Sequence, residues 1–265
     1  MQTHRKEYRY FPSQPEMQKN TIDYKEFKPK SNHIALFYQF KTAKEQNSSI
    51  SLIPDGCLDI VFCCSTSSAD AFLWTSPFSR CEKPVFQKGC EYFGIRLFPE
   101  QSIVKLGKSM KELLNQQIPL RDVLSTEAII IEKISTTPSF HQRIELFCKF
   151  IFQSHFQVSC DQEMIQYAIQ QMNLSKGSIS ISSLSNSLHY SEQYFRKKFE
   201  KYIGFSPKQF CQIIKFQNAL NRFLVSDDTL LNVCLDNGYY DQSHFVKEFK
   251  KFIQLTPKQY KNFFH

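Results

Sequence analysis

Two stretches of the chain, 50 residues apart, carry charged and hydrogen-bonding side chains in matching frames. They are YSEQYFRKKFEKYIGFSPKQF (190–210) and YDQSHFVKEFKKFIQLTPKQY (240–260), and nine of their 21 positions are identical. Unrelated segments would share about one or two positions at ordinary residue frequencies. In both copies the shared apolar residues recur at i, i+4 and i+8, which makes one apolar stripe along a helix. The stripe consists of Phe195, Phe199 and Ile203 in the first copy, and of Phe245, Phe249 and Ile253 in the second.

The side chains opposite this stripe differ between the two copies. They are Glu192, Gln193, Arg196, Lys197 and Glu200 in the first copy, and Gln242, Ser243, Val246, Lys247 and Lys250 in the second. A single such stretch is usually a solvated helix face above an ordinary core. A repeated buried face with a changed outer face is instead the pattern expected when one scaffold reads two different surfaces.

A second candidate chemistry lies in the first half of the chain, where Asp55, Cys57 and Asp59 place a thiol between two carboxylates. No histidine follows nearby, so a turn at residues 54–56 leading into a buried strand is the favoured interpretation. Redox sensing through Cys57, Cys81 or Cys90 is the alternative use of the thiols.

Metal binding has little support in the sequence. The chain has no C-x-x-C motif, the adjacent Cys63 and Cys64 cannot easily ligate one zinc ion, and His155 with Cys160 forms a single pair. We therefore predict no catalytic residues, no metal ligands and no cofactor.

Composition limits the class of protein. Of 265 residues, 42% are hydrophobic and 22% are charged, enough to bury a core, and the net charge of +8 permits a polyanionic partner. Nine cysteines without a regular spacing suit the reduced thiols of a cytosol. The first residues lack the apolar core of a signal peptide, and no apolar run approaches ~20 residues. These features predict a cytoplasmic protein that does not enter a membrane.

The periodicity changes along the chain. Short β-branched and aromatic runs separated by turns predict an antiparallel sheet, sandwich or barrel, with strands at 35–40, 49–54, 58–64, 71–75 and 92–98. Helical spacing follows at 102–116, 121–135 and 138–156. The polar stretch 157–175 contains the expected junction between domains, although Met164–Met172 also suits a helix.

From residue 178 onward the pattern is helical, and each repeat reads as a helix-turn-helix unit. A short amphipathic helix and a tight turn precede each stripe, and Ser191 and Asp241 are expected to cap the second helices. Between the repeats, Pro207–Leu224 predicts a helix of about 18 residues, ~27 Å long. Such a rod could hold the two second helices about one DNA turn, ~34 Å, apart.

At this point the sequence resembles a known family. Residues 175–265 resemble the DNA-binding domain of the AraC/XylS family of bacterial transcription regulators, through the two quoted repeats, the connecting IIKFQNALNRFL and the segment VCLDNGYYDQSHFVKEFKKFIQLTPKQY. The resemblance implies the DNA-binding residues Ser191, Gln193, Arg196, Lys197, Gln242, Ser243, His244, Val246 and Lys247. Asp241 receives only a capping role, because a carboxylate is a poor ligand for phosphate. His189 stands where relatives commonly carry glycine.

Two further stretches, PDGCLDIVF (54–62) and YFGIRLFPEQSIVKLGKSMKELLNQQIPLRDV (92–123), are similar to the sensory or dimerisation domain of a subgroup of these regulators, although Glu100 replaces the usual glycine. Such domains are small β barrels or cupin-like sheets followed by helices. The resemblance implies effector binding or self-association without indicating a particular ligand.

The resulting prediction is an α+β chain of two domains. Residues 1–157 form a small antiparallel β barrel or cupin-like domain with trailing helices, for effector binding or dimerisation. Residues 158–265 form an all-α DNA-binding domain, with helix-turn-helix units at about 180–203 and 229–253 joined by a long helix at 207–224.

The predicted function is a sequence-specific transcription regulator that is not an enzyme and acts as an activator. Its expected partners are double-stranded DNA, RNA polymerase, a small-molecule effector and a second copy of the chain through the N-terminal domain. Two alternatives stay open at the level of sequence: an N-terminal small-molecule enzyme or redox sensor tethered to DNA, and an architectural protein of low specificity.

Overall fold

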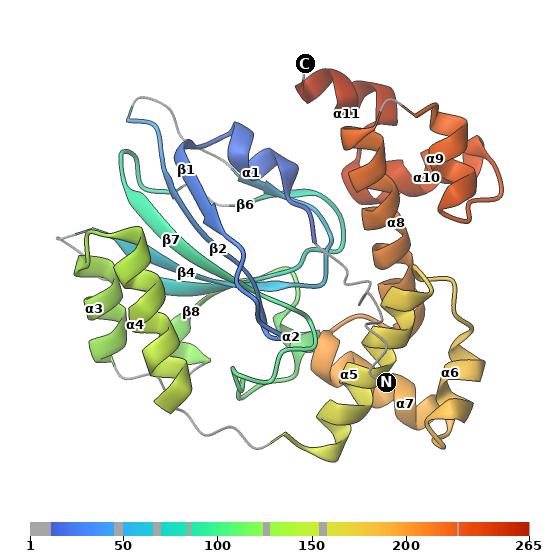
Figure 1. The fold of residues 1–265 in the computed structure, drawn as a ribbon, viewed down its shortest axis with the longest axis horizontal. Helices are drawn as coiled ribbons and strands as arrows, with labels where there is room; N and C mark the ends of the chain where they lie inside the picture. The colour runs from blue at the N-terminus through green and yellow to red at the C-terminus, as the bar shows by residue number, and fades with distance from the viewer. Residues whose placement is uncertain are drawn as a thin grey trace, which may run out of the picture.

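The computed structural model describes residues 12–44, 50–65, 70–83, 86–123, 128–153, 158–226 and 228–264. A curved antiparallel sheet dominates the first part of the chain and helices make up the rest (Figure 1). In spatial order, the strands of the main sheet are β1 (Ile22–Phe27), β2 (Ile34–Lys41), β7 (Glu91–Leu97), β4 (Leu58–Cys64), β5 (Asp70–Thr75) and β8 (Gln117–Pro119). A separate pair consists of β3 (Ile50–Leu52) and β6 (Cys81–Lys83).

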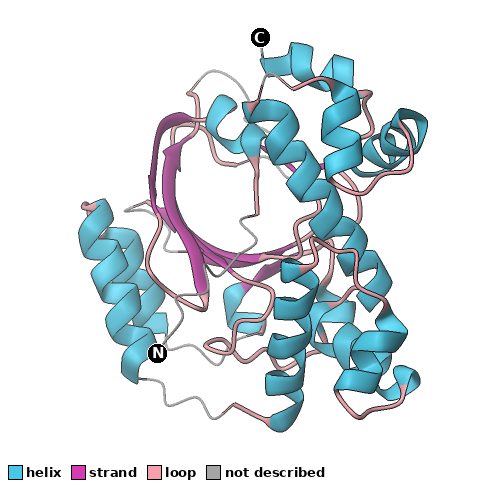
Figure 2. Cartoon of the chain, turned by 45° about the vertical axis from the view of Figure 1, so that its right-hand side comes forward, coloured by secondary structure: helices cyan, strands magenta, loops and turns pink. Residues whose placement is uncertain are grey.

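Both faces of the central strands β2, β7, β4 and β5 are buried, because side chains alternate along each strand and both sets are mostly apolar, whereas the edge strands β1 and β8 are largely exposed. Figure 2 shows the sheet bent into a cup whose outer face is covered by two helices, α3 (Ala128–Thr136) and α4 (Phe140–Gln153). Phe37 packs edge-on against Phe147 of α4 on this side.

The inner face of the cup is filled by aromatic rings, such as Phe86 against Tyr92 at 4.6 Å between centroids. The short helix α1 (Pro15–Lys19) and strand β3 close this side. The predicted α+β architecture, with an antiparallel sheet followed by helices, is confirmed.

The two N-terminal sequence motifs meet in a buried ionic cluster inside the cup. Asp59 on β4 lies opposite Arg96 on β7, and the guanidinium donates from Nε to Oδ1 at 3.0 Å and from Nη2 to Oδ2 at 3.1 Å. Asp55 lies 3.6 Å from the same arginine. Burial raises the pKa of the neighbouring Cys57 thiol, so little reactive thiolate forms there. No disulfide joins any two of the nine cysteines, all of which lie in the described ranges.

Several predicted elements differ from the structure. The strands expected in the first hundred residues are present, but β1, β6 and β8 were not predicted. The helix expected at 102–116 is wrong: only α2 (Met110–Leu113) is helical there. Gln101 explains the difference, because its side chain accepts from the amide of Val104 at 2.8 Å and donates to the carbonyl of Val104 at 3.1 Å, closing a loop.

The helix expected at 121–135 was also wrong in its first part. A short 3-10 helix occupies Leu120–Asp122, α3 spans Ala128–Thr136, and residues 124–127 lie outside the described ranges. The helix expected at 138–156 is confirmed over Phe140–Gln153, and residues 154–157 lie outside the described ranges, as does His155 of the weak metal pair. None of the helices in the described ranges combines the length and apolar character that crossing a bilayer demands.

The second part of the chain is helical throughout its described residues. Its helices are α5 (Cys160–Leu174), α6 (Ile181–Ser187), α7 (Glu192–Ile203), α8 (Pro207–Val225), α9 (Leu230–Asp236), α10 (Gln242–Ile253) and α11 (Pro257–Phe264). Most of the stretch expected to contain the junction therefore forms α5, which begins with a capping box between Ser159 and Gln162. In Figure 1, α6 and α7 lie beside one end of α8, and α9 and α10 lie beside the other.

The turn of the PDG motif docks the sheet-containing part onto α8. Gly56 has a φ of +74°, and a Cβ added to it would lie 2.4 Å from the ring of Phe210 on α8. Next to it, the side chain of Gln217 donates to the carbonyl of Pro54 at 2.8 Å and accepts from the amide of Ser13 at 3.0 Å. The turn predicted from the sequence is thus a contact between the two parts of the chain.

We predict that Gly56→Ala lowers the free energy of unfolding by about 2–4 kcal/mol, because it adds a strained positive φ and a clash with Phe210. Gly89→Ala is the matched control, since Gly89 also has a positive φ of +66° but faces only the flexible side chain of Lys44. Chemical denaturation measures both. Equal losses in the two variants would show that the contact with Phe210 does not constrain Gly56.

Candidate nucleic-acid interface

The first helix-turn-helix unit consists of α6, a tight turn and α7. His189 in the turn has a φ of +58°, a conformation that glycine tolerates better. Ser191 then caps α7 by accepting a hydrogen bond from the amide of Tyr194 at 3.3 Å, as predicted. These local features fix where α7 begins and in which direction it leaves the turn.

The two faces of α7 have opposite character. Phe195, Phe199 and Ile203 are at most 2% exposed, which confirms the predicted stripe. The predicted DNA-binding residues lie on the solvent side: Ser191, Gln193, Arg196 and Lys197 are all exposed. Among the described residues, Lys197 has no ion-pair partner, whereas Arg196 donates from Nε to Glu200 at 2.9 Å.

The second unit repeats this construction with α9 and α10. Gly238 supplies the positive φ of the turn, at +73°. Asp241 caps α10 by accepting from the amide of His244 at 2.7 Å, the role predicted for it. The chain leaves α10 through Gln254, which has a φ of +65°, where the first unit has Gly204.

The outer face of α10 also points to solvent. Gln242, Ser243, His244 and Lys247 are exposed, and Val246 is half-buried. Phe245, Phe249 and Ile253 are fully buried beneath them. The helix also buries a carboxylate that the sequence analysis did not single out: Glu248 is 8% exposed and lies beside Tyr239. Burial and this carboxylate together raise the pKa of the Tyr239 hydroxyl.

Aromatic contacts join both units to the connecting helix α8. The ring of Phe199 on α7 lies 5.6 Å from that of Phe210, near the start of α8. The ring of Phe249 on α10 lies 5.7 Å from Phe216 and 6.0 Å from Phe223, further along the same helix. The two second helices are thus held at different positions along one rod.

Helix α5 supports the first unit through a polar contact. Asp161 accepts from the Tyr194 hydroxyl at 3.1 Å and from the Lys198 ammonium at 2.5 Å, both on α7. Burial alone would raise the pKa of Asp161, but the hydrogen bonds from Lys198 and Tyr194 outweigh it and the pKa is lowered. The carboxylate therefore stays ionised down to low pH.

The sheet-containing part touches both helix-turn-helix units away from most of their solvent-facing residues. At the first unit, Leu114 packs on Gly204 and the Lys111 ammonium donates to Glu200 at 2.7 Å. At the second unit, the amide of Arg80 donates to the carbonyl of Phe252 at 2.6 Å, at the last turn of α10. The side chain of Arg80 is held by the buried Glu16 through two hydrogen bonds of 2.8 and 2.9 Å.

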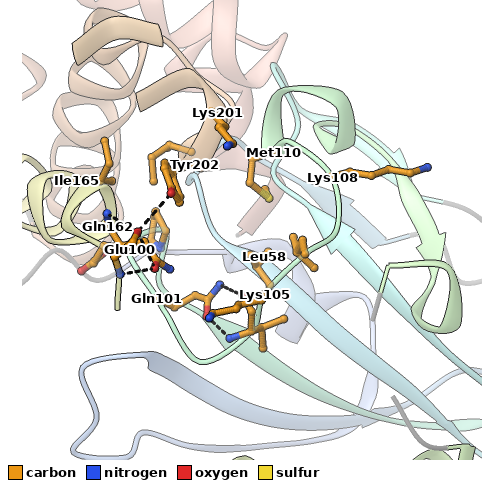
Figure 3. A pocket seen from close by; sticks show the side chains of 15 residues that line it. Leu58, Glu100, Gln101, Lys105, Lys108, Met110, Gln162, Ile165, Lys201 and Tyr202 are labelled. Atoms are coloured by element: carbon orange, nitrogen blue, oxygen red, sulfur yellow. Dashed lines mark hydrogen bonds between the residues drawn. The ribbon is translucent and has the colours of Figure 1, made fainter. Parts of the chain in front are cut away.

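A crevice of about 340 Å³ separates the loop at residues 99–109 from α5 and α7 (Figure 3). Its apolar side chains include Val104 of this loop, Met110 of α2, Ile165 of α5 and Ile203 of α7. Lys105 and Lys201 also line it, and neither forms an ion pair with any described residue. The crevice therefore combines apolar walls with positive charge, which suits a small organic anion.

Sequence reasoning missed this crevice and the contacts around Glu200, because they join residues about ninety positions apart. No group of His, Cys, Asp or Glu side chains suited to a metal ion occurs in the ranges that the structure describes.

Each part of the chain matches a family model. Residues 184–262 match the family model described as a helix-turn-helix domain, and residues 26–119 match a domain of unknown function. Among solved structures, ToxT from Vibrio cholerae is similar at 11% identity, with 85% of this chain and 97% of that chain covered and a TM-score of 0.47.

Two shorter solved structures are similar to the helical part. The C-terminal domain of AraT, a response regulator from Geobacillus stearothermophilus, has 21% identity, covers 40% of this chain and 88% of its own, and gives a TM-score of 0.36. The DNA-binding domain of AdpA, solved with a target DNA, has 16% identity over 40% of this chain and 94% of its own, with a TM-score of 0.35. No curated protein matches the chain significantly.

We predict that Asp161→Asn lowers the thermal midpoint by about 2 °C at pH 7 and that the gap closes at low pH. The folded-state pKa of Asp161 is lowered, so its stabilising effect is present above its unfolded value near ~4. That effect is lost as the pH falls through the lowered folded-state pKa. Glu163→Gln, which removes an exposed carboxylate from the same helical turn, is the control. A gap of unchanged size at pH 2 would contradict the assignment.

Proposed function

We propose that the chain is a transcription regulator of the AraC/XylS family and that its two helix-turn-helix units bind neighbouring major grooves of one DNA duplex. The observation that carries this proposal is the opposition of faces on α7 and α10. Each helix buries an aromatic stripe against α8 and leaves a different polar set in solvent. Because the two exposed sets differ, the site is asymmetric.

Each exposed side chain suits a particular contact with DNA. Arg196, Lys197 and Lys247 can donate to guanine, Gln193 and Gln242 can pair with adenine, and the methyl groups of Val246 can touch thymine. Ser191, Ser243 and His244, at the open ends of the helices, suit contacts to the phosphate backbone.

The sheet-containing part is proposed to sense a small molecule or a partner and to report to the DNA-binding part. We assign it to residues 1–157, and the DNA-binding part to 158–265, because α5 packs against α7 and α8. Activation through contact with RNA polymerase, and pairing of two copies through the N-terminal part, complete the proposal.

The effector site that we favour is the crevice beside α7, and the inner face of the cup is a poorer alternative. The cup is filled by its own aromatic side chains, several of them below 2% exposure. The crevice is open, partly apolar and positively charged, and it is lined by both parts of the chain. A ligand there would touch the last turn of α7 through Lys201 and Tyr202.

We predict that Arg196→Ala and Lys247→Ala each weaken binding to the selected duplex by about 1–3 kcal/mol, if each side chain contacts a base. The duplex is obtained by selection from random sequences with the full chain, and titration by fluorescence anisotropy gives the affinity. Lys149→Ala on α4, an exposed lysine on the far side of the sheet, controls for the loss of one positive charge. If neither variant lowers the affinity for the selected duplex, the assignment of α7 and α10 as DNA-contacting helices is wrong. If the chain binds random DNA equally well, sequence-specific regulation is excluded.

For the crevice, the probe is the fluorescent amphipathic anion 1-anilinonaphthalene-8-sulfonate. We expect saturable binding to the folded chain that weakens about 3–10-fold in Lys201→Gln, which removes charge, and in Leu106→Trp, which fills the space. Lys133→Gln on α3 is the charge control. Binding that is unchanged in both crevice variants would place the anion elsewhere and remove the crevice as the effector site.

A further inference from the structure

The carboxylate of Glu200 bonds two cations that come from different parts of the chain. Its Oε1 accepts from Arg196 Nε at 2.9 Å, one helical turn earlier on α7. Its Oε2 accepts from Lys111 Nζ at 2.7 Å, on α2 of the sheet-containing part. The Glu200 side chain is 16% exposed, whereas both cations are 66% exposed. Hydrogen bonds from Lys111 and then Arg196 lower the pKa of Glu200, which is therefore ionised at neutral pH.

This arrangement bears directly on how Arg196 could reach a base. Without Lys111, Arg196 and Glu200 would form a neutral pair spaced i, i+4, and the whole carboxylate would hold the guanidinium along the helix. A lone carboxylate on this face would also repel DNA phosphates. With Lys111 present, the cluster carries a net charge of +1, and Glu200 keeps a partner when Arg196 moves away.

The attachment of α2 to α7 does not depend on Lys111 alone. Leu114 packs on Gly204, and the Ser109 hydroxyl donates to the carbonyl of Lys201 at 3.3 Å. An exposed ion pair adds little to stability, on the order of 0–1 kcal/mol. The contact between Lys111 and Glu200 is therefore better placed to tune charge at the edge of the recognition helix than to hold the two parts together.

We propose that Lys111 is a positioning residue for DNA recognition by Arg196: it takes one oxygen of the Glu200 carboxylate, so that the guanidinium is held only through Nε and is more easily released to a base. The inference rests on the proposed DNA contact of Arg196 and adds a role for the sheet-containing part. Movement of that part by an effector would withdraw Lys111, leave the whole Glu200 carboxylate to Arg196 and weaken DNA binding by the first unit without covering it.

The test is a double-mutant cycle in the full chain, titrated by fluorescence anisotropy on the selected duplex. We expect Lys111→Gln to weaken binding about fivefold, and Glu200→Gln to bind at least as tightly as the unchanged chain. In the Glu200→Gln background, Lys111→Gln should change the affinity by less than about twofold, because the carboxylate through which Lys111 acts on Arg196 is absent. Lys111→Arg should restore binding, and Lys149→Gln should leave it unchanged.

A second readout separates positioning from a general structural role. In an Arg196→Ala background the loss caused by Lys111→Gln should shrink, because no guanidinium remains to be released and only repulsion between Glu200 and DNA phosphate is left. If Lys111→Gln lowers the DNA affinity equally with and without Glu200, Lys111 contacts phosphate directly. If it does not lower the affinity at all, the ion pair has no role in DNA binding. Either result overturns the inference. If the unchanged chain binds selected and random duplexes equally, the proposed function itself has failed, which is a different outcome.

Discussion

The burial of the apolar stripes of α7 and α10 against one helix, α8, is the interaction on which the rest of the structure depends. Phe199 and Phe249 are both fully buried, and each packs at a steep angle against a ring of α8. Burying one such side chain contributes roughly 1.5–3 kcal/mol, so each recognition helix is fixed by several kcal/mol at a face that DNA would never touch. The outer faces can then vary without loss of fold, which explains why the repeats share their stripe and differ in their polar residues.

The contacts made by the sheet-containing part follow from the same arrangement. Because α8 is covered by recognition helices along part of its surface, the PDG turn reaches it at Phe210 and Gln217. The remaining contacts fall on the trailing ends of the recognition helices, at Gly204 and Phe252. The sheet thus holds both units and their connecting rod at once, while Gln193 and Lys247 stay in solvent. Control by an effector is therefore more readily achieved by changing the relative placement or charge of the units than by covering them.

Features that depend on residues close together in the sequence were predicted correctly, whereas features that depend on distant residues were not. The caps at Ser191 and Asp241 and the stripes of α7 and α10 depend on residues within two turns of one another, and these predictions were confirmed. The helix expected at 102–116 had the right apolar spacing, yet the side chain of Gln101 satisfies the backbone of Val104 and favours a loop. That competition is invisible to a periodicity argument. Strands β6 and β8 pair with strands about 30 and 45 residues earlier in the chain, whereas β1 pairs with its neighbour β2.

The residues of the candidate site likewise fall into those that the sequence identifies and those that it does not. Residues on the outer faces of α7 and α10 can be selected from helical spacing, since exposure follows from the position of the stripe. The partner of an exposed side chain cannot be selected in this way when it lies far along the chain. Lys111 and Glu200 are 89 residues apart and meet where Leu114 packs against a glycine that ends α7.

Gly204 ends α7 where the second unit has Gln254. A side chain at position 204 would collide with Leu114, so the glycine both ends the helix and lets the sheet-containing part approach the first unit. This difference between otherwise matching repeats gives the two units unequal links to the rest of the chain.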